Sequence, residues 1–199
     1  VRMRRFARKE SQRQFVFSHV ALSRLIASYS ADSEEDFRVI KNKHGKPLLE
    51  GVDLAFNLTH SGGCAMIGFS RGVRLGVDIE LVRERESLFD LMARYFSAEE
   101  RLWVLKGDGS DEQSRRFYQV WVAKEAYLKA VGVGLTVDLA SFSVNWLGGS
   151  RFNISHNGER EWSGFVSSVE CGVSNYCAAF CVNKPILSFQ SFQWSSDLL

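Results

Sequence analysis

The feature that most constrains the fold of this chain is the segment GVDIE at residues 76–80. Alternate side chains of a strand point to the same side, so Asp78 and Glu80 share one face and apolar residues occupy the other. A solvated edge strand often carries such a pair. The apolar neighbours favour instead a strand that is buried on at least one face, where two anions need a compensating cation. The segment therefore predicts a core strand with a compensated acidic face.

A helical pattern in WVAKEAYLK at residues 121–129 supplies such a cation. Residues four apart share one face of a helix, so Trp121, Glu125 and Lys129 form a stripe. If this helix packs on the acidic strand, three carboxylates and one ammonium surround a single point. Ligands that are all oxygens suit Mg²⁺, which completes its octahedron with water and phosphate oxygens. The two segments together predict a site that handles phosphate.

The composition is that of a globular chain with an ordinary charge balance. The chain has 199 residues, 45% of them hydrophobic, and its formal net charge of +2 is too small to favour nucleic acid. No apolar run approaches the ~20 residues that a membrane-spanning helix needs. Four cysteines without CxxC spacing favour buried thiols of a reduced protein over a disulfide framework. We therefore expect a cytoplasmic protein that binds neither nucleic acid nor membrane.

Periodicity and turn residues divide the chain into helices and short strands. Apolar residues at helical spacing predict a helix over residues 11–29, and SAEE at residues 97–100 predicts the start of another. A third helix is expected over residues 114–131, ended by a glycine pair, after a loop over residues 106–114. The dipeptide at residues 71–72 predicts a hairpin between its two neighbouring strands. Strands are expected at residues 37–40, 56–62, 64–70, 73–79, 142–146, 151–155, 162–169 and 176–182.

Two segments that contain histidine resemble each other, FNLTHSG at residues 56–62 and FNISHNG at residues 152–158. This weak echo, together with helices and strands in both halves, is consistent with two similar α+β lobes. It also presents two candidate histidines. Only His60 lies between a Gly-Lys-Pro turn and the acidic strand, so we assign a role to His60 and none to His156.

Five motifs follow one another along the chain: GKP at residues 45–47, FNLTHS at 56–61, GVDIE at 76–80, FSAEE at 96–100 and WVAKEAYLK at 121–129. In this order the chain resembles the 4′-phosphopantetheinyl transferase superfamily, in its larger single-chain type (surfactin synthetase activator-like), over nearly its whole length. The resemblance implies transfer of the phosphopantetheine arm of coenzyme A to a serine hydroxyl of an apo acyl or peptidyl carrier protein. The reaction releases 3′,5′-ADP and depends on Mg²⁺.

The same resemblance implies a fold and a set of site residues. The fold is α+β, with two pseudo-symmetric lobes at residues 1–76 and 77–199. Each lobe is a small, mainly antiparallel sheet packed on a long helix, and the coenzyme lies between them. The family's Mg²⁺ ligands match Asp78, Glu80 and Glu125. Its contacts to coenzyme A match Arg13, Lys46, Pro47, Thr59, His60 and Lys129, with Pro47 fixing the turn that presents Lys46.

Attack of a serine oxygen on the β-phosphorus builds charge on a pyrophosphate that is already anionic, so catalysis depends on positioning and electrostatics. Glu125 is the expected general base, directly or through a metal-bound water. Lys129 is expected to hold an α-phosphate oxygen. The other side chains of this helix are expected to be structural, with Trp121 and Tyr127 in the core and Lys124 at the surface or against Glu80.

Two other functions share parts of this residue set. A Mg²⁺-dependent hydrolase of nucleotide-type diphosphates would use the same carboxylates and lysines without a carrier protein. A non-catalytic coenzyme-binding or carrier-binding protein would need fewer of these residues, and the intact acidic set argues against it. We expect a monomer, and the sequence does not specify which carrier protein it serves.

Overall fold

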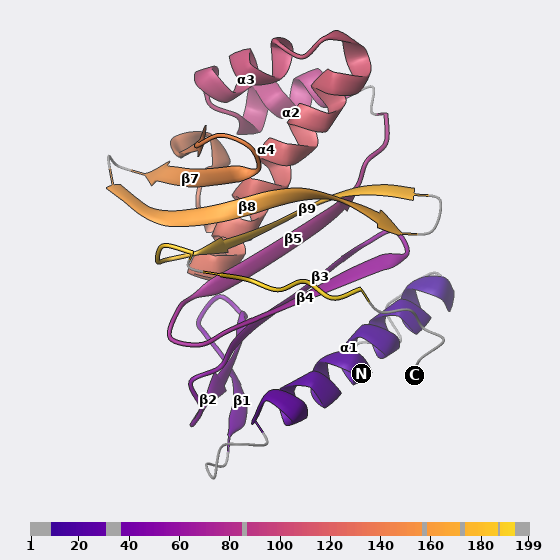
Figure 1. The fold of residues 1–199 in the computed structure, drawn as a ribbon, viewed down its shortest axis with the longest axis vertical. Coiled ribbons are helices and arrows are strands. Elements are labelled where there is room, and N and C mark those ends of the chain that lie inside the picture. The colour runs from indigo at the N-terminus through magenta and orange to yellow at the C-terminus, as the bar shows by residue number, and fades with distance from the viewer. Residues whose placement is uncertain are drawn as a thin grey trace.

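A computed structural model describes residues 9–30, 37–84, 87–156, 159–171, 174–186 and 188–193. Its class is α+β with antiparallel sheets, as the sequence predicts (Figure 1). The helices are α1 (Lys9–Ser30), α2 (Leu88–Tyr95), α3 (Ala98–Leu105), α4 (Gly109–Val131), η2 (Gly134–Thr136) and η3 (Leu139–Ser141). The strands are β1 (Arg38–Lys41), β2 (Pro47–Glu50), β3 (Ala55–Ser61), β4 (Cys64–Ser70), β5 (Leu75–Leu81), β6 (Ser143–Trp146), β7 (Arg151–His156), β8 (Glu159–Cys171) and β9 (Ser174–Val182).

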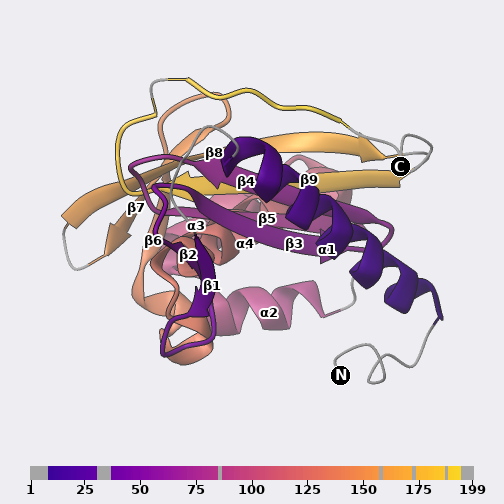
Figure 2. The same ribbon diagram turned by 90° about the horizontal axis from the view of Figure 1, so that it is seen from below.

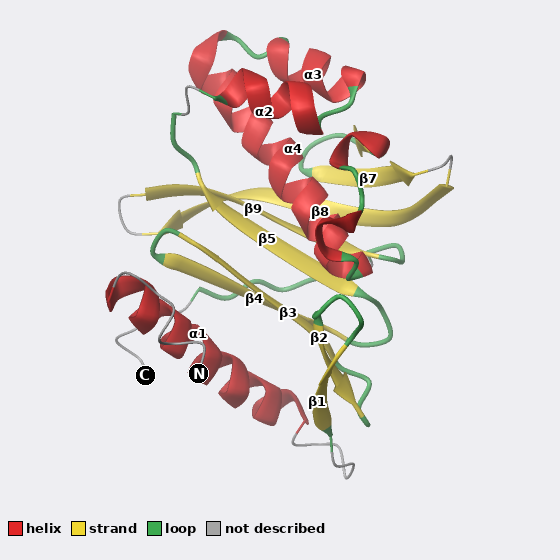
Figure 3. Ribbon diagram, turned by 180° about the vertical axis from the view of Figure 1, so that it is seen from behind, coloured by secondary structure: helices red, strands yellow, loops and turns green. Residues whose placement is uncertain are grey.

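The larger part of the fold is a five-stranded antiparallel sheet with the order β5-β9-β8-β7-β6. Helix α4 crosses one face of this sheet, and α2 and α3 pack near its N-terminal end (Figure 3). The face of α4 turned to the sheet is fully buried at Val122 and Ala126, which pack in the same core as Phe152 and Ile154. Burial of this apolar face fixes the helix over β5 and β9, since burial of apolar area is the main stabilising contribution to such packing.

A smaller part of the fold pairs α1 with the β3–β4 hairpin. The helix runs across the hairpin (Figure 2), and Leu22 and Ile26 of α1 form a buried cluster with Phe56 of β3. The prediction of a long helix packed on a small antiparallel sheet is therefore confirmed twice. The predicted division of the lobes after residue 76 lies just inside β5, and it stays a prediction. None of the described helices is long and apolar enough to cross a bilayer.

The predicted hairpin between β4 and β5 is wrong. Strand β4 pairs with β3, and β5 pairs with β9 of the larger sheet. On the other edge of β5, side-chain oxygens of β3 accept hydrogen bonds from backbone N–H groups. Asn57 Oδ1 accepts from Val77 N at 2.8 Å, and Ser61 Oγ accepts from Leu81 N at 3.2 Å. The turn at residues 71–72 therefore carries the chain from one sheet to the other, because β5 is already hydrogen-bonded on both sides.

The sequence also misplaces the start of α4 and misses three short elements. Helix α4 begins at Gly109, inside the predicted loop, with Asp111 and Glu112 in its first turn. Acidic side chains in that position are stabilised by the helix dipole, which explains how so polar a stretch is helical. Strand β2 and the short helices η2 and η3 were not expected. The predicted start of α3 is confirmed, since Ser97 and Glu100 form a capping box.

Gly76 sets how closely α4 approaches β5. A Cβ atom at this position would overlap the backbone of Ala126 and Ala130. We expect Gly76→Ala to lower the free energy of unfolding by about 1–3 kcal/mol, because the helix must move away from the strand. Urea denaturation measures this change. Gly63→Ala is the matched control, since nothing lies within 4 Å of its Cβ position, and equal stability of the two variants would contradict the close packing.

Candidate active site

A buried acidic residue, a hydroxyl and an ammonium from three different elements meet at one point. Asp78 of β5 is 2% exposed, and its Oδ1 accepts a hydrogen bond from Thr59 Oγ1 of β3 at 3.1 Å. Lys129 of α4 forms an ion pair with the same oxygen and donates to Thr59 Oγ1 at 3.0 Å. Thr59 thus donates to Asp78 and accepts from Lys129. The structure brings together the predicted acidic strand and the predicted helix.

The second oxygen of Asp78 is buried and lacks a hydrogen-bond partner among the described residues. Burial raises the pKa of Asp78, and the Lys129 ammonium partly offsets that rise. A buried carboxylate oxygen without a donor is unfavourable unless a cation approaches it. Asp78 Oδ2 is therefore the atom of this cluster that is best suited to receive a further positive charge.

Two more carboxylates lie around this cluster. Glu80, two residues along β5, accepts a hydrogen bond from Ser61 Oγ at 2.7 Å. Glu125 lies one turn before Lys129 on α4, and no hydrogen bond joins its carboxylate to the described residues. Burial raises the pKa of Glu125; the Lys129 ammonium opposes this rise, and the charges of Asp78 and Glu80 add to it. All three predicted metal ligands are thus close enough to influence one another.

Three carboxylates suit Mg²⁺, but in this structure Asp78 is paired with the ammonium of Lys129. Within the described ranges, no group of three or more His, Cys, Asp or Glu side chains is placed to hold a metal ion. The ammonium of Lys129 instead acts as the cation at Asp78. The donor set and the unpartnered Asp78 Oδ2 nevertheless fit a hard divalent cation. Asp78, Glu80 and Glu125 therefore stay the predicted ligands of Mg²⁺.

The residues predicted to contact coenzyme A are not gathered in one place. Thr59 belongs to the acidic cluster, whereas the adjacent His60 is exposed and points to the opposite face of β3. Lys46 donates to two backbone carbonyls, Leu75 O at 2.9 Å and Ala130 O at 3.0 Å. Pro47 is the first residue of β2 and pairs with Lys41. Arg13 lies in α1, but its side chain is outside the described residues.

Sequence reasoning gave no role to Asn57 and Ser61, which join β3 to β5 through their side chains. A signal was present in the alternation of polar residues along β3. Asn57, Thr59 and Ser61 all point to one side of the strand, as residues two apart must. The predicted core positions of Trp121 and Tyr127 are confirmed, since both pack against the main core cluster.

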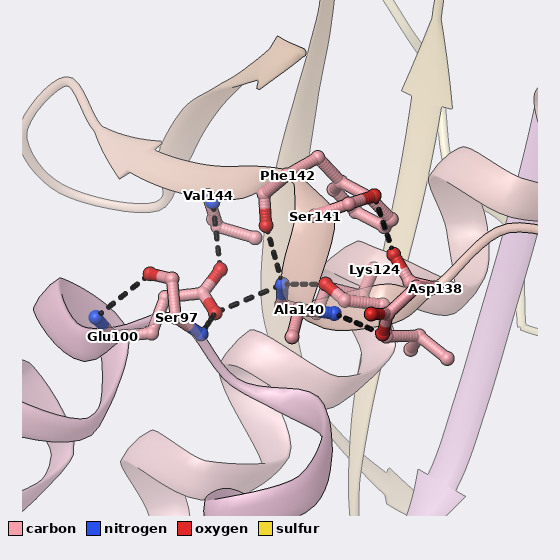
Figure 4. Close-up of polar contacts among 9 residues, drawn as sticks. Ser97, Glu100, Lys124, Asp138, Ala140, Ser141, Phe142 and Val144 are labelled. Carbon is pink, nitrogen blue, oxygen red and sulfur yellow. Dashed lines mark hydrogen bonds and ion pairs between the residues drawn. The ribbon is translucent and has the colours of Figure 1, made fainter. Parts of the chain in front are cut away.

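Lys124 was expected at the surface or against Glu80. Both expectations are wrong, because its side chain is fully buried and pairs with Glu100. Figure 4 shows its ammonium at the centre of a polar cluster with Glu100 and Phe142. Lys124 Nζ forms an ion pair with Glu100 Oε2 at 2.9 Å and donates to Leu139 O and Phe142 O, each at 2.7 Å. Glu100 Oε1 accepts from Val144 N at 2.8 Å. All three N–H groups of the ammonium therefore have an acceptor.

Lys124→Met is expected to lower the free energy of unfolding by about 3 kcal/mol, because Glu100 would remain buried without its cation. The loss should shrink in the double variant Lys124→Met/Glu100→Gln, which removes both charges. Urea denaturation of the two variants measures the difference. A Lys124→Met variant as stable as the unmodified protein would contradict a stabilising role of the buried ion pair.

Comparisons with known proteins identify the family of this chain. Residues 74–181, more than half of the chain, match the family model of the ACPS 4′-phosphopantetheinyl transferase superfamily. The chain is 30% identical to the 4′-phosphopantetheinyl transferase ffp of Bacillus subtilis over 183 residues, which cover 92% of this chain and 79% of that protein. It is 32% identical to the transferase Sfp of Bacillus subtilis over 142 residues, 71% of this chain and 62% of Sfp.

A solved structure is also similar. A holo-(acyl-carrier-protein) synthase from Bacillus anthracis, in complex with CoA (3′,5′-ADP), covers 55% of this chain and 95% of its own, with 25% identity and a TM-score of 0.43. The chain matches 62% of the length of Sfp and 54% of a putative transferase from Synechocystis, less than two thirds of either. From the family model and the similarity to ffp, we conclude that this chain belongs to the 4′-phosphopantetheinyl transferase superfamily.

Proposed function

We propose that this chain transfers the 4′-phosphopantetheine arm of coenzyme A to a serine hydroxyl of an apo acyl or peptidyl carrier protein. The reaction would release 3′,5′-ADP, depend on Mg²⁺ and take place in the cytoplasm, with the enzyme acting as a monomer. Family membership supports the reaction class, and the acidic site supports the metal. The two lobes, divided after residue 76, would hold the coenzyme between them.

The observation that carries the proposal is the shared position of Asp78, Thr59 and Lys129. It places the ammonium of Lys129 beside a buried carboxylate whose other oxygen has no donor among the described residues. The pyrophosphate of the substrate supplies an anion that Lys129 can bind in place of Asp78. Asp78, Glu80 and Glu125 would then hold Mg²⁺, which would neutralise charge that develops on the pyrophosphate.

Two side chains of α4 bind the phosphate and accept the proton in the proposed reaction. Lys129 binds a phosphate oxygen of the coenzyme and holds the pyrophosphate in place, because an ammonium and a phosphate form a charge-assisted hydrogen bond. Glu125 accepts the proton of the attacking serine. It does so directly or through a water, and it has no hydrogen bond to another described residue that would have to break.

The proposal is tested by the intact mass of several apo carrier proteins after incubation with this protein, coenzyme A and Mg²⁺. A gain of one phosphopantetheine arm that disappears with EDTA, and with a carrier whose acceptor serine is replaced by alanine, would support it. Hydrolysis of coenzyme A without a modified carrier would favour a diphosphate hydrolase instead. Binding without any reaction would favour a non-catalytic coenzyme-binding protein.

The part of the proposal that concerns the coenzyme's 3′-phosphate and adenine side rests on the family resemblance, which matches the contacts there with Arg13, Lys46, Thr59 and His60. We expect His60→Ala to raise the dissociation constant for coenzyme A about tenfold by removing one hydrogen bond to a charged group. Isothermal titration calorimetry measures it. The affinity for 3′-dephospho-coenzyme A should not change, and an unaltered affinity for coenzyme A itself would remove His60 from the site.

A further inference from the structure

The turn between β1 and β2 fastens the end of α4 to the start of β5 (Figure 3). Asn42 Nδ2 donates to Gly132 O at 2.7 Å, and Lys46 Nζ donates to Ala130 O at 3.0 Å and to Leu75 O at 2.9 Å. Two side chains of one turn therefore reach both elements that carry the acidic site. None of these contacts has a part in the proposed reaction.

The turn itself is organised by the same asparagine. Asn42 Oδ1 accepts from the backbone N–H groups of His44 and Lys46, at 3.0 and 2.9 Å. This arrangement fixes the backbone from which the Lys46 side chain extends, so that Asn42 and Lys46 act as one unit. A change at Asn42 should therefore disturb the contacts of Lys46 as well.

The contacts also complete the C-terminus of α4. The last carbonyls of a helix have no partner within the helix, and Lys46 and Asn42 supply donors to two of them. The helix ends at Gly132, which has φ +76°, and a Cβ atom there would lie 2.9 Å from Asn42 Nδ2 and Lys46 Cδ. The turn is thus packed closely against the helix end, where a positive charge also complements the helix dipole.

The position of this contact matters for the site. Ala130 follows Lys129 directly, and Leu75 precedes Gly76, where the backbones of α4 and β5 approach most closely. A shift at this point would move Lys129 relative to Asp78. Misplacement of a reacting group by about 1 Å can lower a rate by about a hundredfold.

We propose that Asn42 and Lys46 are positioning residues, which clamp the end of α4 to the start of β5 so that Lys129 and Glu125 face Asp78. The inference rests on the proposed function for its kinetic consequence. It gives Lys46 a role through α4, in place of the predicted contact with the coenzyme's 3′-phosphate.

The chemistry of Lys46 is compatible with a clamp. Burial, and then the nearby Arg74, lower the pKa of Lys46 to about 8. A neutral amine still has two N–H groups, and the two carbonyls require two. The contacts of Lys46 to Leu75 and Ala130 therefore do not need the charged form, whereas a phosphate ligand would.

The test compares Lys46→Met and Asn42→Ala with coenzyme A and with 3′-dephospho-coenzyme A as substrates. A clamp predicts that both variants lower kcat about tenfold or more with either substrate. It also predicts that the ratio of the two KM values stays as in the unmodified protein. Lys46→Arg, which keeps several N–H donors, should recover part of the lost kcat. The matched control is Lys43→Met, the same change at an exposed lysine of the same turn, which should leave kcat unchanged.

A KM increase that is confined to coenzyme A in Lys46→Met, with Asn42→Ala unaffected, would overturn the clamp in favour of a phosphate ligand. Amide hydrogen exchange over residues 129–132 supplies a readout that does not depend on activity. Faster exchange in both variants supports the clamp, and unchanged exchange contradicts it, even if the unmodified protein transfers nothing and the proposed function fails. If Lys46→Met does not fold, Asn42→Ala and Lys46→Arg carry the same comparison.

Discussion

Glu125→Gln is expected to lower the rate of phosphopantetheine transfer by about a hundredfold to ten-thousandfold, the range that a positioned general base contributes. The amide has the size and shape of the carboxylate, so the packing of α4 on β5 should persist. It cannot accept the serine proton, and it is a weaker ligand for Mg²⁺ because it has no charge. The loss should therefore appear in kcat, with little change in the affinity for coenzyme A.

Carrier modification by intact mass over time, with coenzyme A and Mg²⁺ at saturation, measures this loss. Glu112→Gln makes the same chemical change on the same helix. Glu112 forms partly exposed ion pairs with Arg115 and Arg116 within its own helix, and such pairs contribute little to stability. This control should keep the rate of the unmodified protein. A Glu125→Gln variant of normal activity would show that neither the base nor the metal ligand has been identified correctly.

The acidic site could be predicted because its residues follow local periodicities. A period of two in β5 gives Asp78 and Glu80 a common face, and a spacing of four in α4 does the same for Glu125 and Lys129. The packing of one element on the other follows from their apolar faces. The helix signals were local too, and the capping box at Ser97 is where the sequence places it.

Features that depend on distant partners could not be predicted in this way. Lys124 looks like a surface lysine by its neighbours, but its partners Leu139 and Phe142 come from a loop that the sequence does not connect with it. The pairing of β5 with β9 joins segments about a hundred residues apart, whereas the predicted hairpin with β4 is local. The contacts of Lys46 with Leu75 and Ala130 also depend on tertiary packing.

Lys129→Met is expected to have two opposite effects, a loss of transfer and a gain in metal affinity. The rate should fall about a thousandfold, the upper range for loss of one group that stabilises charge in a transition state. In the protein without coenzyme, however, the ammonium of Lys129 is the cation that Asp78 binds. Its removal takes away the positive charge that Lys129 supplies to Asp78, Glu80 and Glu125. The affinity for Mg²⁺ alone should therefore rise by at least about tenfold, since a charge interaction at about 4 Å is about 4 kcal/mol near a protein surface and is reduced where solvent screens it.

Isothermal titration calorimetry with Mg²⁺, in the absence of coenzyme A, separates this effect from catalysis. Lys106→Met is the control, since it removes the same charge from an exposed position at the end of α3 and should leave the affinity unchanged. A rise confined to Lys129→Met would show that the lysine and the metal compete for Asp78, so that coenzyme phosphate must draw Lys129 away before the metal binds tightly. A fall in the affinity for Mg²⁺ would mean that Lys129 favours metal binding. In that case the bridge from Lys129 through Thr59 orients Asp78 for the metal, and the three side chains bind it as one unit.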